Sequence, residues 1–100
     1  MRRYTVTPLA KADLREIFRY IAKDNLPAAE RLLEQLHDRF AQVARNPQSG
    51  ELRPSIGEGV RSVSVGNYVI IFRPNKKKLQ IVRVIHGARD IETIFRKSES

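Results

Sequence analysis

The sequence predicts an α+β fold in which one antiparallel helical hairpin packs on a small, mainly antiparallel sheet, in the order βααβββ. A short strand-like segment opens the chain, and two amphipathic helical segments follow with a short link between them. Three β-type runs separated by turns occupy most of the last third. The chain has 100 residues, enough for one modest core, so we expect a single domain over residues 1–100.

The first strand is expected over residues 2–7, where Tyr4 and Val6 fall on one face. Pro8 ends this strand and suits the first turn of a helix, with Thr7 as the N-cap. Apolar residues at helical spacing then predict an amphipathic helix over residues 8–23. These residues are Leu14, Ile17, Phe18, Ile21 and Ala22.

A second helix is expected after the break at Asp24-Asn25-Leu26-Pro27, with Asn25 or Leu26 as its cap. Apolar residues continue at helical spacing to Ala44, and Asn46-Pro47 ends the helix. Two helices joined by so short a link form an antiparallel hairpin. Its apolar stripe must be covered, and the sheet is the surface available to cover it.

Residues 51–59 contain a proline and two glycines and are expected to be irregular. Alternation from Val60 to Val65 predicts a strand, and Gly66-Asn67 suits a two-residue hairpin turn because both residues tolerate positive φ. The segment from Tyr68 to Arg73 is apolar through its middle, which predicts a central strand buried on both faces.

The last strand is expected from Leu79 to Ile85. Simple alternation places Leu79, Ile81, Arg83 and Ile85 on one face and Gln80, Val82 and Val84 on the other. Gly87 ends the strand. A final helical turn with Ile91, Ile94 and Phe95 is expected to pack back, while Lys97 to Ser100 are expected to be frayed.

The composition is strongly basic, with a formal charge of +8. Residues 1–50 carry nine Lys and Arg against six Asp and Glu, whereas residues 51–100 carry ten against five. This excess favours an anionic partner, either nucleic acid or an acidic protein. The alternative is a basic domain that has no anionic ligand.

The chain has no cysteine, so neither a disulfide framework nor a thiolate metal site can form. No stretch reaches the ~18 apolar residues that span a membrane. No apolar signal core follows Met1-Arg2-Arg3-Tyr4. We therefore expect a soluble, cytoplasmic protein with no membrane partner. Because the sequence has neither a glycine-rich phosphate loop nor a cluster of metal ligands, we expect no cofactor and no metal.

His86 stands at the end of the last predicted strand, with Arg83 and Arg89 nearby. Neighbouring arginines favour the neutral imidazole, which could act as a base near neutral pH. Alternatively, His86 bonds the backbone at the strand end. Arg61, on the first strand after the helices, could clamp a phosphate or a carboxylate. The alternative for these arginines is an internal pair, such as Arg89 with Asp90 or Glu92.

Other candidates have simpler interpretations. His37 lies in the middle of a helix and is expected on the surface. Lys76-Lys77-Lys78 lies in a hairpin turn, where runs of charge are usually solvated. Tyr68 and Phe72 share one strand face and are expected in the core, with base stacking as the minor alternative.

Several motifs follow one another in a fixed order along nearly the whole chain. They are Tyr4-Thr5-Val6-Thr7, Asp13-Leu14, Tyr20-Ile21-Ala22, Pro47-Gln48-Ser49-Gly50, Gly59-Val60-Arg61, Val65-Gly66-Asn67-Tyr68-Val69-Ile70 and Val84-Ile85-His86-Gly87-Ala88-Arg89-Asp90. Together, at these distances, they resemble the ParE-type toxins of the ParE/RelE toxin–antitoxin superfamily.

The resemblance implies the RelE/ParE-like fold and one of two toxic activities that cause growth arrest. ParE members, known for plasmid stability systems, poison DNA gyrase. RelE members cut mRNA on the ribosome with charged and aromatic side chains of the sheet. Here a ribonuclease would have to use Arg61, Arg83 and His86. The strand from Tyr68 to Phe72 carries no basic residue and no tyrosine follows Tyr68, which favours gyrase inhibition without enzymatic activity. A non-catalytic binding module is the third possibility.

The resemblance also implies a genetically linked, ParD-like antitoxin that wraps and neutralises the toxin, with DNA contacted only indirectly through the antitoxin complex. We expect the antitoxin to bind the helical hairpin. Its candidate contacts are Leu14, Ile17, Phe18 and Ile21. The candidate contacts for the target are Arg61, Arg83, His86 and Arg89.

Overall fold

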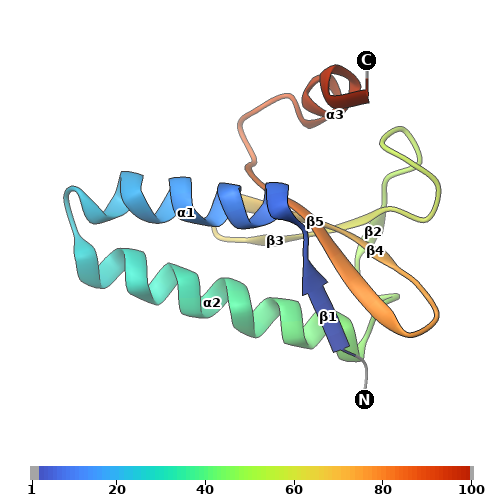
Figure 1. Ribbon diagram of the computed structural model, residues 1–100, viewed down its shortest axis with the longest axis horizontal. Coiled ribbons are helices and arrows are strands. Elements are labelled where there is room, and N and C mark those ends of the chain that lie inside the picture. Colours follow the sequence, from blue (N-terminus) through green and yellow to red (C-terminus); the bar gives the residue numbers. More distant parts are fainter. Residues whose placement is uncertain (1–2, 100) are drawn as a thin grey trace.

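The computed structural model describes residues 3–99 and contains five strands and three helices. In chain order they are β1 (Arg3–Val6), α1 (Pro8–Ala22), α2 (Leu26–Arg45), β2 (Glu51–Leu52), β3 (Arg61–Val65), β4 (Tyr68–Pro74), β5 (Lys78–His86) and α3 (Ile91–Glu99). The α+β class, the helical hairpin and the three consecutive antiparallel strands are confirmed (Figure 1).

The strands form one mixed sheet in the order β1-β5-β4-β3-β2. β1 runs parallel to β5, and every other neighbouring pair is antiparallel. The prediction that residues 51–59 are irregular is wrong for the first two of them. Glu51 pairs with Ser62 and Leu52 with Arg61, so β2 adds a short fifth strand at the far edge.

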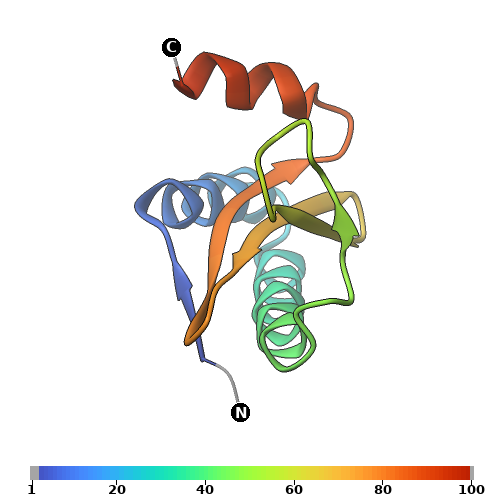
Figure 2. The same ribbon diagram turned by 90° about the vertical axis from the view of Figure 1, so that its right-hand side faces the viewer.

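α1 and α2 lie antiparallel and cover one face of the sheet, here called the inner face (Figures 1 and 2). Thr7 caps α1 by accepting a hydrogen bond from Ala10 N, and Asn25 caps α2 by accepting one from Ala28 N, as predicted. The core under the hairpin is apolar and almost fully buried. Its largest members are Leu36, Phe40, Ile70, Phe72, Leu79 and Ile81.

The other face of the sheet, here called the outer face, carries a second, smaller core. Figure 2 shows α3 on the opposite side of the sheet from α2. Ile91 is buried against Ile71 and Ile85, with Ile94 and Phe95 packed beside them. The predicted turn is therefore a nine-residue helix that continues through Lys97 to Glu99, while Ser100 lies outside the described residues. Because both faces are covered, β4 is apolar through its middle, as expected.

The simple alternation predicted for the last strand is wrong at its C-terminal half. Ile71 pairs with Arg83, whereas the next residue, Phe72, pairs with Ile81, so Val82 is an extra residue in a β-bulge. The bulge reverses the faces beyond it. Val84 joins the inner core, and Ile85 joins the outer one.

Candidate functional site

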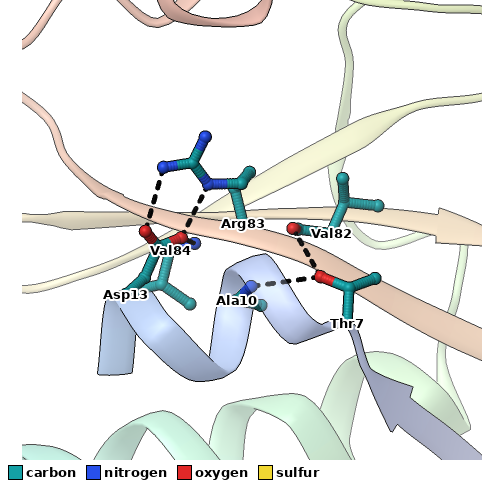
Figure 3. Close-up of polar contacts among 6 residues, drawn as sticks. All are labelled: Thr7, Ala10, Asp13, Val82, Arg83 and Val84. Carbon is teal, nitrogen blue, oxygen red and sulfur yellow. Dashed lines mark hydrogen bonds and ion pairs between the residues drawn. The ribbon is translucent and has the colours of Figure 1, made fainter. Parts of the chain in front are cut away.

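The site is built where α1 closes the free edge of β5. β1 pairs with β5 only as far as Ile81, so the backbone beyond that residue needs other partners. Thr7 N donates to Ile81 O at 3.0 Å, and Thr7 Oγ1 donates to Val82 O at 2.9 Å. Six residues further on, which is nearly two helical turns, Asp13 Oδ2 accepts a hydrogen bond from Val84 N at 2.9 Å (Figure 3).

Asp13 also holds Arg83, through two parallel hydrogen bonds. Arg83 Nε donates to Oδ2 at 2.8 Å and its terminal NH2 group donates to Oδ1 at 2.9 Å (Figure 3). The two side chains are only 14% and 12% exposed. Donation to the Asp13 carboxylate raises the pKa of Arg83. Arg83 therefore forms an internal ion pair with Asp13. An internal pair was the alternative to ligand binding that the sequence analysis gave for these arginines.

Next to this ion pair lies an open pocket of about 720 Å³, between the second half of α1, the start of β4 and the C-terminal end of β5. His86 and Arg89 both line it, so the structure brings these two candidates together. Its other walls include Glu16, Tyr20, Ile21, Asn67 and Tyr68. Aromatic, acidic and basic groups thus meet at one end of the sheet, in a depression open to solvent.

His86 is exposed at this pocket and is oriented from two sides. Its ring packs edge-on against Tyr68 with centroids 5.3 Å apart. Its Nδ1 accepts a hydrogen bond from Ala88 N at 3.1 Å, which is the backbone role considered from the sequence. The neutral ring therefore carries its proton on Nε2 and can present it as a donor to a partner.

Arg89 is held next to His86 by the backbone, since Arg89 N donates to His86 O at 3.0 Å. The acidic neighbours suggested for it have other hydrogen bonds. Asp90 accepts from Thr93 N and Oγ1 at the start of α3, and Glu92 accepts from Ser55 Oγ. The Arg89 side chain is exposed at the rim of the pocket.

Arg61 lies away from the His86 pocket. It pairs with Phe72, whereas His86 pairs with Tyr68, so about 13 Å of strand separates the two rows at ~3.3 Å per residue. Its guanidinium donates to Gly50 O at 2.7 Å and to Gln48 O at 3.3 Å. Arg61 holds the turn after α2, and the structure does not bring it together with His86.

A second depression lies on α1 and α2, with an apolar floor and a basic rim. This groove of about 450 Å³ is lined by Val6, Lys11, Leu14, Arg15, Phe18, Arg19, Leu33 and His37. Phe18 and the surface position of His37 were predicted from the sequence, whereas the three cations were not. The sequence contains a pattern that predicts this basic rim, since Lys11, Arg15 and Arg19 recur every four residues and so share one helix face.

The four candidate antitoxin contacts have different surroundings. Leu14 is buried in the core, and Ile17 is packed against it. Phe18 is half-buried at the basic groove, and Ile21 is half-buried at the His86 pocket. Ile17, Phe18 and Ile21 are therefore the three that keep part of their apolar surface open to a partner.

Two further findings concern the described part of the chain. No helix there is both long and apolar enough to cross a membrane. Within the same residues, no three His, Cys, Asp or Glu side chains gather in a way that could hold a metal ion.

Two solved structures with the same architecture come from toxin–antitoxin systems. A chain of the chromosomal ParDE system from P. aeruginosa has a TM-score of 0.73 and 25% identity, covering 86% of this chain and 96% of that one. A chain of the RelBE2 toxin–antitoxin complex from Mycobacterium tuberculosis has a TM-score of 0.57 and 25% identity, covering 85% and 96%. Together with the strand order and the helical hairpin, these similarities define a protein of the RelE/ParE superfamily.

The sequence comparisons narrow this class. Residues 4–91 match the model of the ParE toxin of type II toxin–antitoxin systems. Toxin ParE3 of Caulobacter vibrioides is 25% identical over 92 residues, which are 91% of this chain and 92% of that protein. The chain belongs to the ParE toxin family.

Proposed function

We propose that this protein is a ParE-type toxin that inhibits DNA gyrase in the cytoplasm and is neutralised by a cognate, ParD-like antitoxin. Membership of the ParE family supports the toxin role. Gyrase is the target that the resemblance to ParE toxins implies. The systems named for the two similar structures support an antitoxin partner.

One observation weighs most against the alternative, a ribosome-dependent ribonuclease. Such an enzyme needs an acid–base group and phosphate-binding cations that converge on one reacting centre. Arg83 is bound by Asp13, and Arg61 is bound by the carbonyl groups of Gln48 and Gly50 at a distant row of the sheet. His86 is thus left with Arg89 alone among the four candidates.

We propose the His86 pocket as the surface that contacts the target. Arg89 supplies an exposed guanidinium and His86 an Nε2 donor, while Tyr20, 74% exposed, offers an aromatic side chain at the rim. Aromatic and arginine side chains together are typical of binding hot spots. Loss of one such contact typically costs about 1–3 kcal/mol, which corresponds to roughly 5- to 150-fold weaker binding.

The experiment is gyrase supercoiling with purified variants. Arg89→Ala and Tyr20→Ala should each raise the concentration for half-inhibition at least about fivefold. Arg31→Ala removes the same charge as Arg89→Ala, from an exposed position on α2. It is the matched control and should inhibit like the parent chain. If Arg89→Ala and Tyr20→Ala inhibit as strongly as the control, the target surface lies elsewhere.

We propose the groove on α1 and α2 as the antitoxin surface. Its apolar floor suits the apolar face of an amphipathic helix, and its rim cations suit acidic side chains on that helix. Arg15→Glu with Arg19→Glu should weaken antitoxin binding, most at low salt, because the rim charges are reversed. In gyrase assays without antitoxin this variant should still inhibit. Unchanged antitoxin affinity would exclude the groove.

A further inference from the structure

From the fold we infer that the outer face of the sheet binds the phosphate backbone of duplex nucleic acid directly, through a strip of cations. We call Arg3, Arg73, Lys76, Lys77 and Lys78 the outer strip. This inference is independent of the target pocket and the antitoxin groove. It also differs from the expectation that DNA is contacted only through an antitoxin complex.

Strand pairing brings these residues together. Arg3 on β1 pairs with Lys78 on β5, and Arg73 on β4 pairs with Gln80, two residues along β5. In β4, Ile71 belongs to the outer core and Phe72 to the inner one, so Arg73 lies on the outer face. Lys76 and Lys77 lie in the turn between β4 and β5.

The dimensions suit a duplex. With strands ~4.8 Å apart and ~3.3 Å per residue, Arg3 and Arg73 have Cα atoms about 12 Å apart. That separation is close to the ~12 Å width of the major groove of B-DNA, so the two guanidinium groups can reach phosphates on both of its sides. The lysines between and beside them can follow one backbone.

The charges of the strip are available to a ligand. All five residues are exposed, and within the residues whose side chains the structure describes none of them forms an ion pair. From Gly59 to Arg89 the chain carries seven Lys and Arg and no Asp or Glu, and the acidic residue before this range is Glu58, in the loop next to Arg73. Glu51, whose backbone pairs with Ser62, lies on β2 at the opposite edge of the sheet.

Neighbouring groups extend the polar surface around Arg73. Arg53 Nε donates to Ser62 Oγ at 3.0 Å, which places a second guanidinium on the outer face. A Cβ atom at Gly57 would lie 3.1 Å from the Arg73 NH2 group, so this glycine allows Arg73 to lie against the loop. Gln80 and Thr5 add hydrogen-bonding side chains between the cations, which suits contacts to phosphate and sugar.

The same surface is poorly suited to the other candidate partners. Protein interfaces depend on large apolar or aromatic anchors. Among the residues whose side chains are described, the exposed large apolar ones lie on α1, α2 and β2; they are Leu9, Tyr20, Leu26 and Leu52. Single-stranded nucleic acid needs aromatic stacking platforms, and the outer strip contains no aromatic residue. A duplex backbone needs only cations and hydrogen-bond donors.

The experiment measures binding of the full chain to a labelled DNA duplex of roughly 20 base pairs, from about 50 to about 200 mM salt. We expect affinity to fall with salt, with a logarithmic slope of about −0.9 for each cation that contacts a phosphate. Arg73→Ala with Lys78→Ala should make the slope shallower by about 1.8 and weaken binding about eightfold per cation at 0.1 M salt. Two duplexes of different sequence should bind alike.

Lys23→Ala with Arg31→Ala is the matched control, since it removes the same charge from exposed residues of the helical hairpin. It should bind the duplex within about twofold of the parent chain. If the strip variant loses its fold on heating earlier than the control, Lys76→Ala with Lys77→Ala in the exposed turn replaces it. Equal weakening by strip and control variants, undetectable binding, or preference for single-stranded RNA or an acidic peptide would overturn the inference.

Discussion

Replacing Asp13 with alanine removes the group that joins α1 to the free edge of β5. The carboxylate accepts three hydrogen bonds, from Arg83 Nε and NH2 and from Val84 N, at 2.8–2.9 Å. In the Asp13→Ala variant a largely buried guanidinium and a backbone N–H lose their partner together. The variant should therefore be destabilised although Asp13 is in neither core.

The magnitude follows from burial. Removing one partner of a buried ion pair costs about 3–5 kcal/mol. Arg83 and Asp13 keep 14% and 12% exposure, so water reaches them in part and the lower end, about 3 kcal/mol, applies. For a chain of this size each kcal/mol lowers Tm by about 4–8 °C, so Tm should fall by roughly 12–24 °C. Asp13→Asn keeps an acceptor for Val84 N and should lose only about 1–2 kcal/mol.

Thermal and urea unfolding measure these changes. Glu34→Ala, at an exposed position on α2, is the control, and its free energy of unfolding should stay within about 0.5 kcal/mol of the parent chain. The hydrogen bond to Asp13 raises the pKa of Arg83, so the contribution of the arginine is complete below the usual arginine range and is lost only above it. The stability gap between the parent chain and Arg83→Met should therefore stay constant between about pH 6 and about pH 9. A Tm for Asp13→Ala within about 2 °C of the parent would show that the Asp13 carboxylate does not stabilise the fold.

Three further substitutions test the fold. Gly50→Ala should cost about 1–3 kcal/mol in urea unfolding, because its Cβ would lie 2.7 Å from the Phe72 ring and 2.9 Å from Ser62 O. Gly66→Ala should cost about 1 kcal/mol from backbone strain alone, since φ is 56° and no atom lies within 4 Å; an unchanged stability would contradict the turn geometry. Thr7→Ala should cost about 1–2 kcal/mol, while Thr7→Ser, which keeps the cap, should recover most of it.

The predictable parts of the fold depend on local chemistry. The caps at Thr7 and Asn25 and the turn at Gly66 each require a residue type whose side chain or backbone suits that one position. The apolar middle of β4 indicates burial on both faces without any knowledge of its neighbours. These elements could therefore be located from short stretches of sequence.

The parts that failed depend on distant partners. β2 has two residues and exists because Glu51 and Leu52 pair with β3. The bulge at Val82 disrupts a pattern of alternation that otherwise suits a regular strand. The expected burial and charge of an arginine do not show whether its guanidinium already has an internal hydrogen-bond partner. Arg83 meets a carboxylate 70 positions earlier in the chain, so the candidate site could be predicted only as a list of residues.

One preparation of this ParE-family chain can test the proposed action on gyrase in two parallel assays. Purified chain is added to gyrase with supercoiled and relaxed plasmid, and to ribosomes carrying a defined mRNA. We expect inhibited supercoiling with accumulation of cleaved DNA, together with intact mRNA. Normal supercoiling with cut mRNA would contradict it and make Arg61, Arg83 and His86 the residues to study.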